Sequence, residues 1–157
     1  PQRYEIWTMQ SSWHNLPEFE PESAQYQQQP GLEFAARDVA VNDALDAITM
    51  DIAPAYGAVP GLGFYRRRVQ LSANGLTLQE ETDFSRTVAL TLMSVEKPAV
   101  EGGTVQFGTL AAAHIKGFAR IATEAVPITD PRLRQAWPDT LYRTRICFTG
   151  ALTVEVQ

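Results

Sequence analysis

His14 and His114 are the residues of this 157-residue chain best suited to bind a metal ion or to act as a general base. His14 lies in the stretch SSWHN, between a tryptophan and an asparagine, and His114 lies in LAAAHIKG. Zinc takes three or four nitrogen, oxygen or sulfur ligands, and no second histidine lies near either one. On spacing alone, His14 is a weak ligand candidate, and His114 is expected to be a surface or turn residue.

No sequence pattern indicates a catalytic nucleophile. The histidines accompany no Gly-x-Ser-x-Gly motif, and the one cysteine, Cys147, lies in the apolar strand pattern TRICFTG. Cys147 is therefore predicted to be a small core residue, and it has no partner for an internal disulfide. The glycines of GAVPGLGF, residues 57–64, match neither the Walker pattern nor the dinucleotide-binding pattern. They predict a loop that leads into a strand.

Three consecutive arginines, Arg66, Arg67 and Arg68, could contact a uronate or sulfate group, because guanidinium groups match planar oxyanions. Strand alternation places Arg66 and Arg68 on the face opposite Val69. It places Arg67 on the apolar side, where the charge would need a carboxylate partner. A solvated strand face with cross-strand partners such as Glu80 is the simpler interpretation, and ligand binding is the alternative.

Trp7, Trp13 and Trp137 could stack on sugar rings. Tryptophans of a β-sandwich more often anchor the apolar core, and the sequence does not tell which face each ring occupies. Both alternatives therefore stay open, and the carbohydrate-binding residues stay unassigned.

The charge of the chain excludes some partners. A net charge of -5 and a pI near 5.0, with acidic residues spread along the chain, disfavour nucleic acid and anionic membranes. The longest uncharged span, residues 102–115, is too short to cross a bilayer, and the start of the chain lacks the pattern of a signal peptide. The compartment stays open. A first residue other than Met suggests a piece of a longer protein.

The elements that would position these residues are mostly β-strands. Alternating or β-rich segments with turn signals between them predict strands at residues 3–10, 32–41, 47–53, 87–96, 104–110, 118–126, 141–149 and 152–156, and a hairpin over 64–84. Asn74-Gly75 predicts a type I′ turn in that hairpin. One short helix is expected near residues 131–136, with Asp130 as N-cap and Pro131 at its first position. Residues 18–31 are expected to form an exposed loop.

This pattern predicts one all-β domain over residues 1–157, an antiparallel two-sheet β-sandwich, with a closed barrel as the structural alternative. A chain of this length can bury about two thirds of the surface of its unfolded form, so its core needs no disulfides.

Four stretches, EIWTMQSSWHNLP, MDIAPAYG, RRRVQL and DPRLRQAWPDTLYR, resemble the C-terminal β-sheet domain of heparinase II/III-like proteins, which are bacterial polysaccharide lyases. The resemblance runs from about Arg3 to the C-terminus. It implies that the intact protein carries an N-terminal (α/α) toroid, binds an acidic polysaccharide between toroid and sandwich, and cleaves it by β-elimination at a uronic acid.

The resemblance assigns no catalytic residue to this chain, because the family's His-x-His-Asn-Asp motif is absent. The isolated chain is therefore predicted to be inactive. His14 matches a family position that binds a structural metal, usually zinc, whose other ligands would lie upstream of Pro1. The loop at 18–31 is longer and more acidic than in family members. A non-catalytic carbohydrate-binding or structural β-sandwich module is the alternative function.

Overall fold

The computed structural model describes residues 6–23 and 26–157 and shows an all-β protein, which confirms the predicted fold class. Every paired strand is antiparallel. The strands are β1 (Pro17–Phe19), β2 (Arg37–Asn42), β3 (Ala47–Asp51), β4 (Tyr65–Ser72), β5 (Gly75–Thr82), β6 (Val88–Ser94), β7 (Ala99–Glu101), β8 (Thr104–Phe107), β9 (Ala111–Pro127) and β10 (Thr140–Val156). The 3-10 helices are η2 (Trp7–Met9), η3 (Ser11–Trp13), η4 (Asp43–Leu45), η5 (Ala53–Tyr56) and η6 (Leu133–Gln135).

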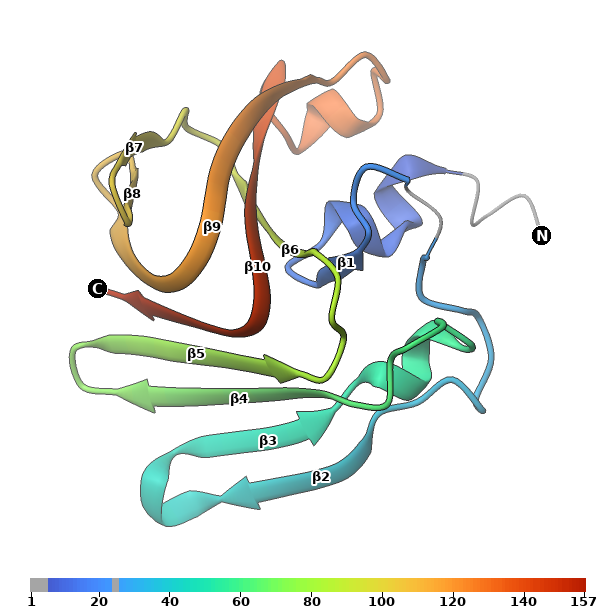
Figure 1. Cartoon of the computed structure of the whole chain (residues 1–157). Helices are drawn as coiled ribbons and strands as arrows, with labels where there is room; N and C mark the ends of the chain where they lie inside the picture. The colour runs from blue at the N-terminus through green and yellow to red at the C-terminus, as the bar shows by residue number, and fades with distance from the viewer. Residues whose placement is uncertain (1–5, 24–25) are drawn as a thin grey trace.

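The two layers of the sandwich share the long strands β9 and β10 instead of forming separate sheets. Residues 142–148 of β10 pair with β6, and residues 151–156 pair with β5. Both long strands curve from one layer into the other, as Figure 1 shows. The curve coincides with Gly117 and Gly150, whose φ angles of 86° and 76° are accessible mainly to glycine. One sheet therefore continues through both layers, in the order β2-β3-β4-β5-β10-β9-β8-β7.

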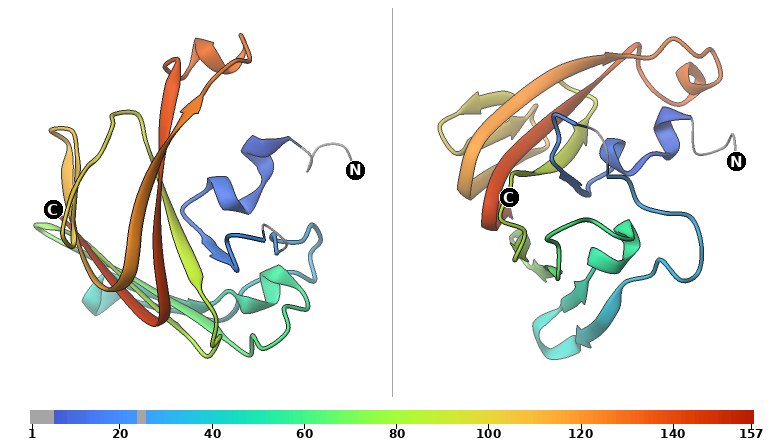
Figure 2. Two further views of the ribbon diagram at one scale, coloured as in Figure 1. Left: turned by 45° about the horizontal axis from the view of Figure 1, so that its top comes forward. Right: turned by 45° about the vertical axis from the view of Figure 1, so that its right-hand side comes forward.

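An aromatic cluster fills the core between the layers. The Phe19 ring meets those of Tyr56, Tyr65 and Phe84 edge to face, with centroid distances of 4.9, 5.7 and 5.2 Å. All four side chains are buried. Figure 2 shows the N-terminal segment and β1 in the angle between the layers. Edge-to-face rings add stabilisation beyond their buried area, so Phe19 fastens this segment to the sandwich.

The start of the chain differs from the predictions. Residues 3–5 of the expected strand at 3–10 lie outside the described residues, and the rest forms η2, so the strand prediction is wrong there. His14 follows η3 and lies in no strand. Partly buried hydrogen bonds to the Gln27 side chain favour the turn: Ser11 Oγ donates to Gln27 Oε1, and the backbone N–H of Ser12 donates to the same oxygen. These bonds satisfy groups that a sheet would otherwise pair.

The loop expected at 18–31 is also partly wrong. Glu18 and Phe19 belong to β1 and are buried, and Pro21 is buried as well. The sequence suggested exposure because this stretch is polar and bounded by prolines, but β1 pairs with β6 and inserts Phe19 into the core. Tertiary packing here outweighs local composition.

The predicted hairpin at 64–84 is confirmed as β4 and β5, but its turn differs from the prediction. Ser72 pairs with Gly75, so Ala73 and Asn74 are the two turn residues, and neither has the positive φ that a type I′ turn requires. Gly75 begins β5 instead. A Cβ there would clash with the carbonyl oxygen of Val156, so glycine permits the close approach of the last strand.

Most of the remaining strands are as predicted, but β2 begins at Arg37 and not at residue 32, and β7 was not predicted. The segments at 141–149 and 152–156 join into the single strand β10, and β9 begins seven residues before its predicted start at 118. The short helix near 131–136 is the 3-10 turn η6. Asp130 Oδ1 accepts a hydrogen bond from the Arg132 N–H at 2.8 Å, but this bond lies in the turn before η6. Arg132 is the N-cap of η6 and no side chain caps the helix, so the predicted N-cap role of Asp130 is wrong.

Candidate functional site

His14 lies on an exposed part of the surface, and its Nε2 atom is 3.0 Å from the carbonyl oxygen of Thr8. A carbonyl oxygen only accepts hydrogen bonds, so Nε2 carries the proton in this contact. In the neutral ring Nδ1 then keeps its lone pair, and no described residue is bonded to it. Metal-binding histidines usually have this arrangement, in which one nitrogen donates to a carbonyl and the other binds.

Two nearly buried arginines hold the segment that carries His14. Arg67 of β4 donates from Nη1 to the carbonyl oxygen of Asn15 at 2.9 Å. Arg143 of β10 donates from Nη1 to the carbonyl oxygen of Ser12 at 3.3 Å, and its guanidinium carbon lies 4.1 Å from the centroid of the Trp13 ring. Cationic donors and a cation–π contact are strong where water is largely excluded. Both layers therefore fix the segment.

The three tryptophans come together beside His14. Trp7 meets Trp13 edge to face with a centroid distance of 4.9 Å and lies 6.2 Å from Trp137. Together with other residues they line a pocket of about 300 Å³, which we call the tryptophan pocket: Trp7, Thr8, Trp13, His14, Asn15, Met93, Trp137 and Leu141. Trp7 and Trp13 also pack against a small second core of Val126, Ile128 and Leu141. The tryptophans therefore both pack against this core and line the pocket.

A second hollow continues from the tryptophan pocket. This apolar groove has a volume of about 540 Å³ and is lined by Asn15, Leu92, Met93, Ser94, Val95, Glu96, Phe107, Leu110, Ala111, Trp137, Leu141 and Val156. Asn15, Met93, Trp137 and Leu141 line both hollows. Trp137 is 37% exposed, so its ring lies at the junction of pocket and groove with part of its surface open.

Arg67 also forms a buried ion pair with Glu80, its cross-strand neighbour on β5. The prediction that Arg67 would need a carboxylate partner is confirmed. Burial raises the pKa of Glu80, and the Arg67 charge acts against that rise. Tyr65 is also buried and lies beside the pair, where it interacts with Glu80. Arg67 thus connects the buried pair to Asn15.

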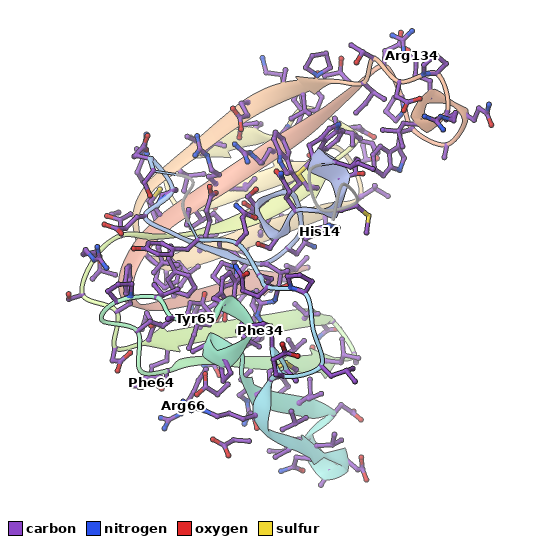
Figure 3. All side chains as sticks on the ribbon, turned by 90° about the vertical axis from the view of Figure 1, so that its right-hand side faces the viewer. His14, Phe34, Phe64, Tyr65, Arg66 and Arg134 are labelled. Carbon is purple, nitrogen blue, oxygen red and sulfur yellow. The ribbon has the colours of Figure 1, made fainter. Side chains whose placement is uncertain are left out.

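Arg66 and Arg68 lie on the opposite face of β4, as predicted. The Arg66 side chain is 64% exposed, and its Nη1 is 3.9 Å from Glu81 Oε2. Both arginines line a separate hollow of about 470 Å³, but Asp38, Asp51 and Glu81 line it too. This mixture of charges favours a solvated strand face over an anion site. Figure 3 shows Arg66 well separated from His14.

The other sequence candidates lie away from the tryptophan pocket. Cys147 is buried and unpaired, as predicted for a core residue. His114 is exposed, as expected, but it lies within β9, where Nδ1 is 3.2 Å from Thr104 Oγ1. Residues 57–64 form the loop that leads into β4.

Sequence reasoning missed the role of Arg143. Its ring contact and its bond to Ser12 depend on distant parts of the chain meeting. One signal was present: in the alternation of β10, Arg143 and Arg145 lie on the same face as Leu141 and Cys147, so charged and apolar residues share that face. A buried arginine needs partners, and the carbonyl oxygen of Ser12 and the carboxylate of Glu124 supply them.

No group of three or more His, Cys, Asp or Glu side chains within residues 6–23 and 26–157 is arranged to hold a metal ion. His14 fits a zinc ligand by its chemistry and by its available Nδ1. A tetrahedral zinc site would need three further ligands. The metal role of His14 therefore stays a prediction.

No protein-family model matches this chain, and no curated protein is detected as a relative. The resemblance to heparinase II/III-like proteins stays a prediction as well. Among the described residues, no helix is long and apolar enough to span a membrane.

Proposed function

We propose that this chain is the β-sandwich domain of a heparinase II/III-like polysaccharide lyase and has no catalytic activity on its own. In the intact enzyme it would form one wall of the substrate cleft, beside an N-terminal (α/α) toroid. The state of His14 carries the proposal, because its Nε2–H is bonded to Thr8 while Nδ1 is available. The resemblance assigns a metal-ligand role to this same histidine.

The chemistry of β-elimination explains why the domain would need a partner. A base removes the proton α to the uronate carboxyl group, an acid protonates the departing glycosidic oxygen, and a third group stabilises the enediolate charge. Apart from His14, no side chain that lines the tryptophan pocket is an acid or a base. We therefore assign the base and the acid to the toroid, with the sandwich binding and orienting the polysaccharide.

In this proposal a structural zinc ion would connect the His14 segment to the part of the enzyme that supplies the other ligands. Arg67 and Arg143 hold the backbone on either side of His14, so the imidazole is presented from a fixed segment. Preorganised ligands bind metal more tightly because less conformational freedom is lost on binding.

Metal analysis of the complete protein tests this role. The protein expressed from the full reading frame should contain zinc in stoichiometric amount, and His14→Ala should lose it. His114→Ala is the matched control, because His114 is also exposed but lies on β9. Equal zinc content in wild type and His14→Ala would remove the ligand role.

The alternative function is a non-catalytic carbohydrate-binding or structural sandwich, which the accessible Trp137 ring favours. The sequence encoded upstream of Pro1 separates the two. A His-x-His-Asn-Asp element preceded by several hundred helical residues supports the lyase, and its absence removes the catalytic claim.

A further inference from the structure

We infer that the tryptophan pocket is a sugar subsite that binds one uronate ring of the polysaccharide, stacked on Trp137. The identity of the polysaccharide as acidic rests on the proposed function. The accessible indole surfaces, the unpaired hydrogen-bond donors and the charges around the pocket support the subsite.

The three indole rings differ in how much of their surface a ligand can reach. The Arg143 guanidinium lies over Trp13, and Trp7 packs against the edge of the same ring. Trp137 is the most exposed of the three and lines both the tryptophan pocket and the apolar groove. A pyranose presents a face of C–H groups that packs on an aromatic ring, so Trp137 is the platform and Trp7 a side wall.

The pocket also offers hydrogen-bond donors. Asn15 Oδ1 accepts a bond from the Met93 N–H at 3.3 Å, which fixes the orientation of the amide and leaves the Nδ2 donors without a partner among the described residues. The indole N–H groups of Trp7, Trp13 and Trp137 are likewise in no hydrogen bond with the described part of the chain. Sugar hydroxyl and carboxylate oxygens accept such bonds. An aliphatic ligand would leave these donors unpaired at a cost in affinity.

The local charge suits an anionic sugar, although the chain carries a net charge of -5. No described carboxylate lines the tryptophan pocket, and the Arg143 guanidinium, which is paired with Glu124 of β9, lies over the Trp13 ring. The neighbouring apolar groove contains one carboxylate, Glu96. A uronate is therefore better accommodated in the pocket than in the groove, and the groove suits the less charged ring of a mixed polysaccharide.

Titration of the 157-residue chain with oligosaccharides tests the inference. The probes are tetrasaccharides of alginate and of hyaluronan, with cellotetraose as the neutral comparison, and binding is followed by calorimetry and by tryptophan fluorescence. We expect the acidic probes to bind and Trp137→Ala to weaken them about tenfold. Leu71→Ala is the matched control, because it truncates an exposed apolar side chain on β4, and it should leave affinity unchanged.

Asn15→Asp tests the donors with little change of shape. It replaces the amide donors by a negative charge but keeps an oxygen that can accept from Met93. Binding of acidic tetrasaccharides should fall at least tenfold, and circular dichroism should show that the variant remains folded. No binding of either acidic probe, or unchanged affinity in Trp137→Ala, would overturn the inference.

This experiment can fail or succeed independently of the test of the proposed lyase function. Binding of acidic tetrasaccharides that depends on Trp137 supports the subsite even if the complete protein proves to have no lyase activity. Conversely, lyase activity of the complete protein without binding to this chain would overturn the subsite and leave the proposed function standing. Equal affinity for cellotetraose would overturn the assignment to a uronate ring.

Discussion

Arg67 on β4 donates a hydrogen bond to the carbonyl oxygen of Asn15, 52 positions away in the chain, at a distance of 2.9 Å. The same guanidinium pairs with Glu80 in the core. The Arg67 side chain therefore connects the buried face of β4 and β5 to Asn15, the residue that follows His14. Because the ion pair fixes the arginine, it also fixes the position of the exposed segment.

Breaking the buried pair should cost stability. Arg67→Met leaves Glu80 buried without its partner, and we expect the free energy of unfolding to fall by about 3 kcal/mol. Urea denaturation measures this loss. Arg66→Met is the matched control on the exposed face of the same strand, and it should change stability by less than about 0.5 kcal/mol. Equal losses in the two variants would contradict the account.

The double variant Arg67→Met with Glu80→Met separates stability from positioning. It removes both charges and should recover most of the lost stability. It cannot restore the bond to Asn15, so backbone amides of residues 12–16 should exchange hydrogen faster than in wild type. Wild-type exchange rates there would show that Arg67 does not position the segment.

Asp51 should make stability depend on acidic pH. Burial alone would raise its pKa, but hydrogen bonds from the N–H groups of Tyr65 and Ala53 and from Arg37 outweigh burial and lower the pKa below 3.8. The folded state thus binds fewer protons than the unfolded state. This contribution to stability is present above pH 3.8 and is lost as the pH falls through the lower folded-state pKa.

Asp51→Asn tests this dependence. At pH 7 it should cost about 2 kcal/mol, because the carboxylate accepts three hydrogen bonds and an amide cannot replace them all. The difference from wild type should shrink below pH 3.8, as measured by thermal denaturation at several pH values. A difference that does not depend on pH would contradict the lowered pKa.

The contribution of Glu18 to stability should depend on pH in the opposite direction to that of Asp51. Burial raises its pKa, partly offset by Arg143 and Arg145, and its Oε2 has no hydrogen-bond partner among the described residues. The wild type therefore loses stability as the pH rises from 4.5 through the raised folded-state pKa. Glu18→Gln should be more stable than wild type by about 1 kcal/mol at pH 7 and similar to it at pH 4. Thermal denaturation of both proteins at pH 7 and at pH 4 measures this difference, and equal stabilities at pH 7 would contradict the prediction.

His14→Ala should have little effect on the isolated chain. The side chain is exposed and makes one hydrogen bond, to Thr8, so we expect a stability change below about 1 kcal/mol and no change in metal content. Stoichiometric zinc in the isolated wild type that is lost on substitution would show that residues of this chain complete the site.

Sequence periodicity predicted the regular strands well and the irregular N-terminal segment poorly. The alternation at Tyr65 and Val69 is strong because one face of β4 packs on the core, whereas Leu71 continues the pattern but is exposed near the end of the strand. Ser11 and Ser12 gave no such signal, because the polar side chain of Gln27 meets their hydrogen-bonding needs. Phe19 looked exposed among prolines and glutamates, and only its pairing with Val88 explains its burial.

The residues of the candidate site could be predicted from the sequence, but their arrangement in space could not. His14 and the tryptophans were candidates from their residue types. That Trp137 lies beside Trp7 depends on β9 and β10 carrying η6 toward the N-terminal segment, which spacing along the chain cannot reveal. The arginine anchors likewise join residues 52 and 131 positions apart.

The release of unsaturated uronate tests the central claim most directly. The protein expressed from the full reading frame should release it from at least one member of a panel of uronate-containing polysaccharides, seen as rising absorbance, and the 157-residue chain alone should release none. No product from the complete protein with any member of the panel, or product from the chain alone in independent preparations, would contradict the account.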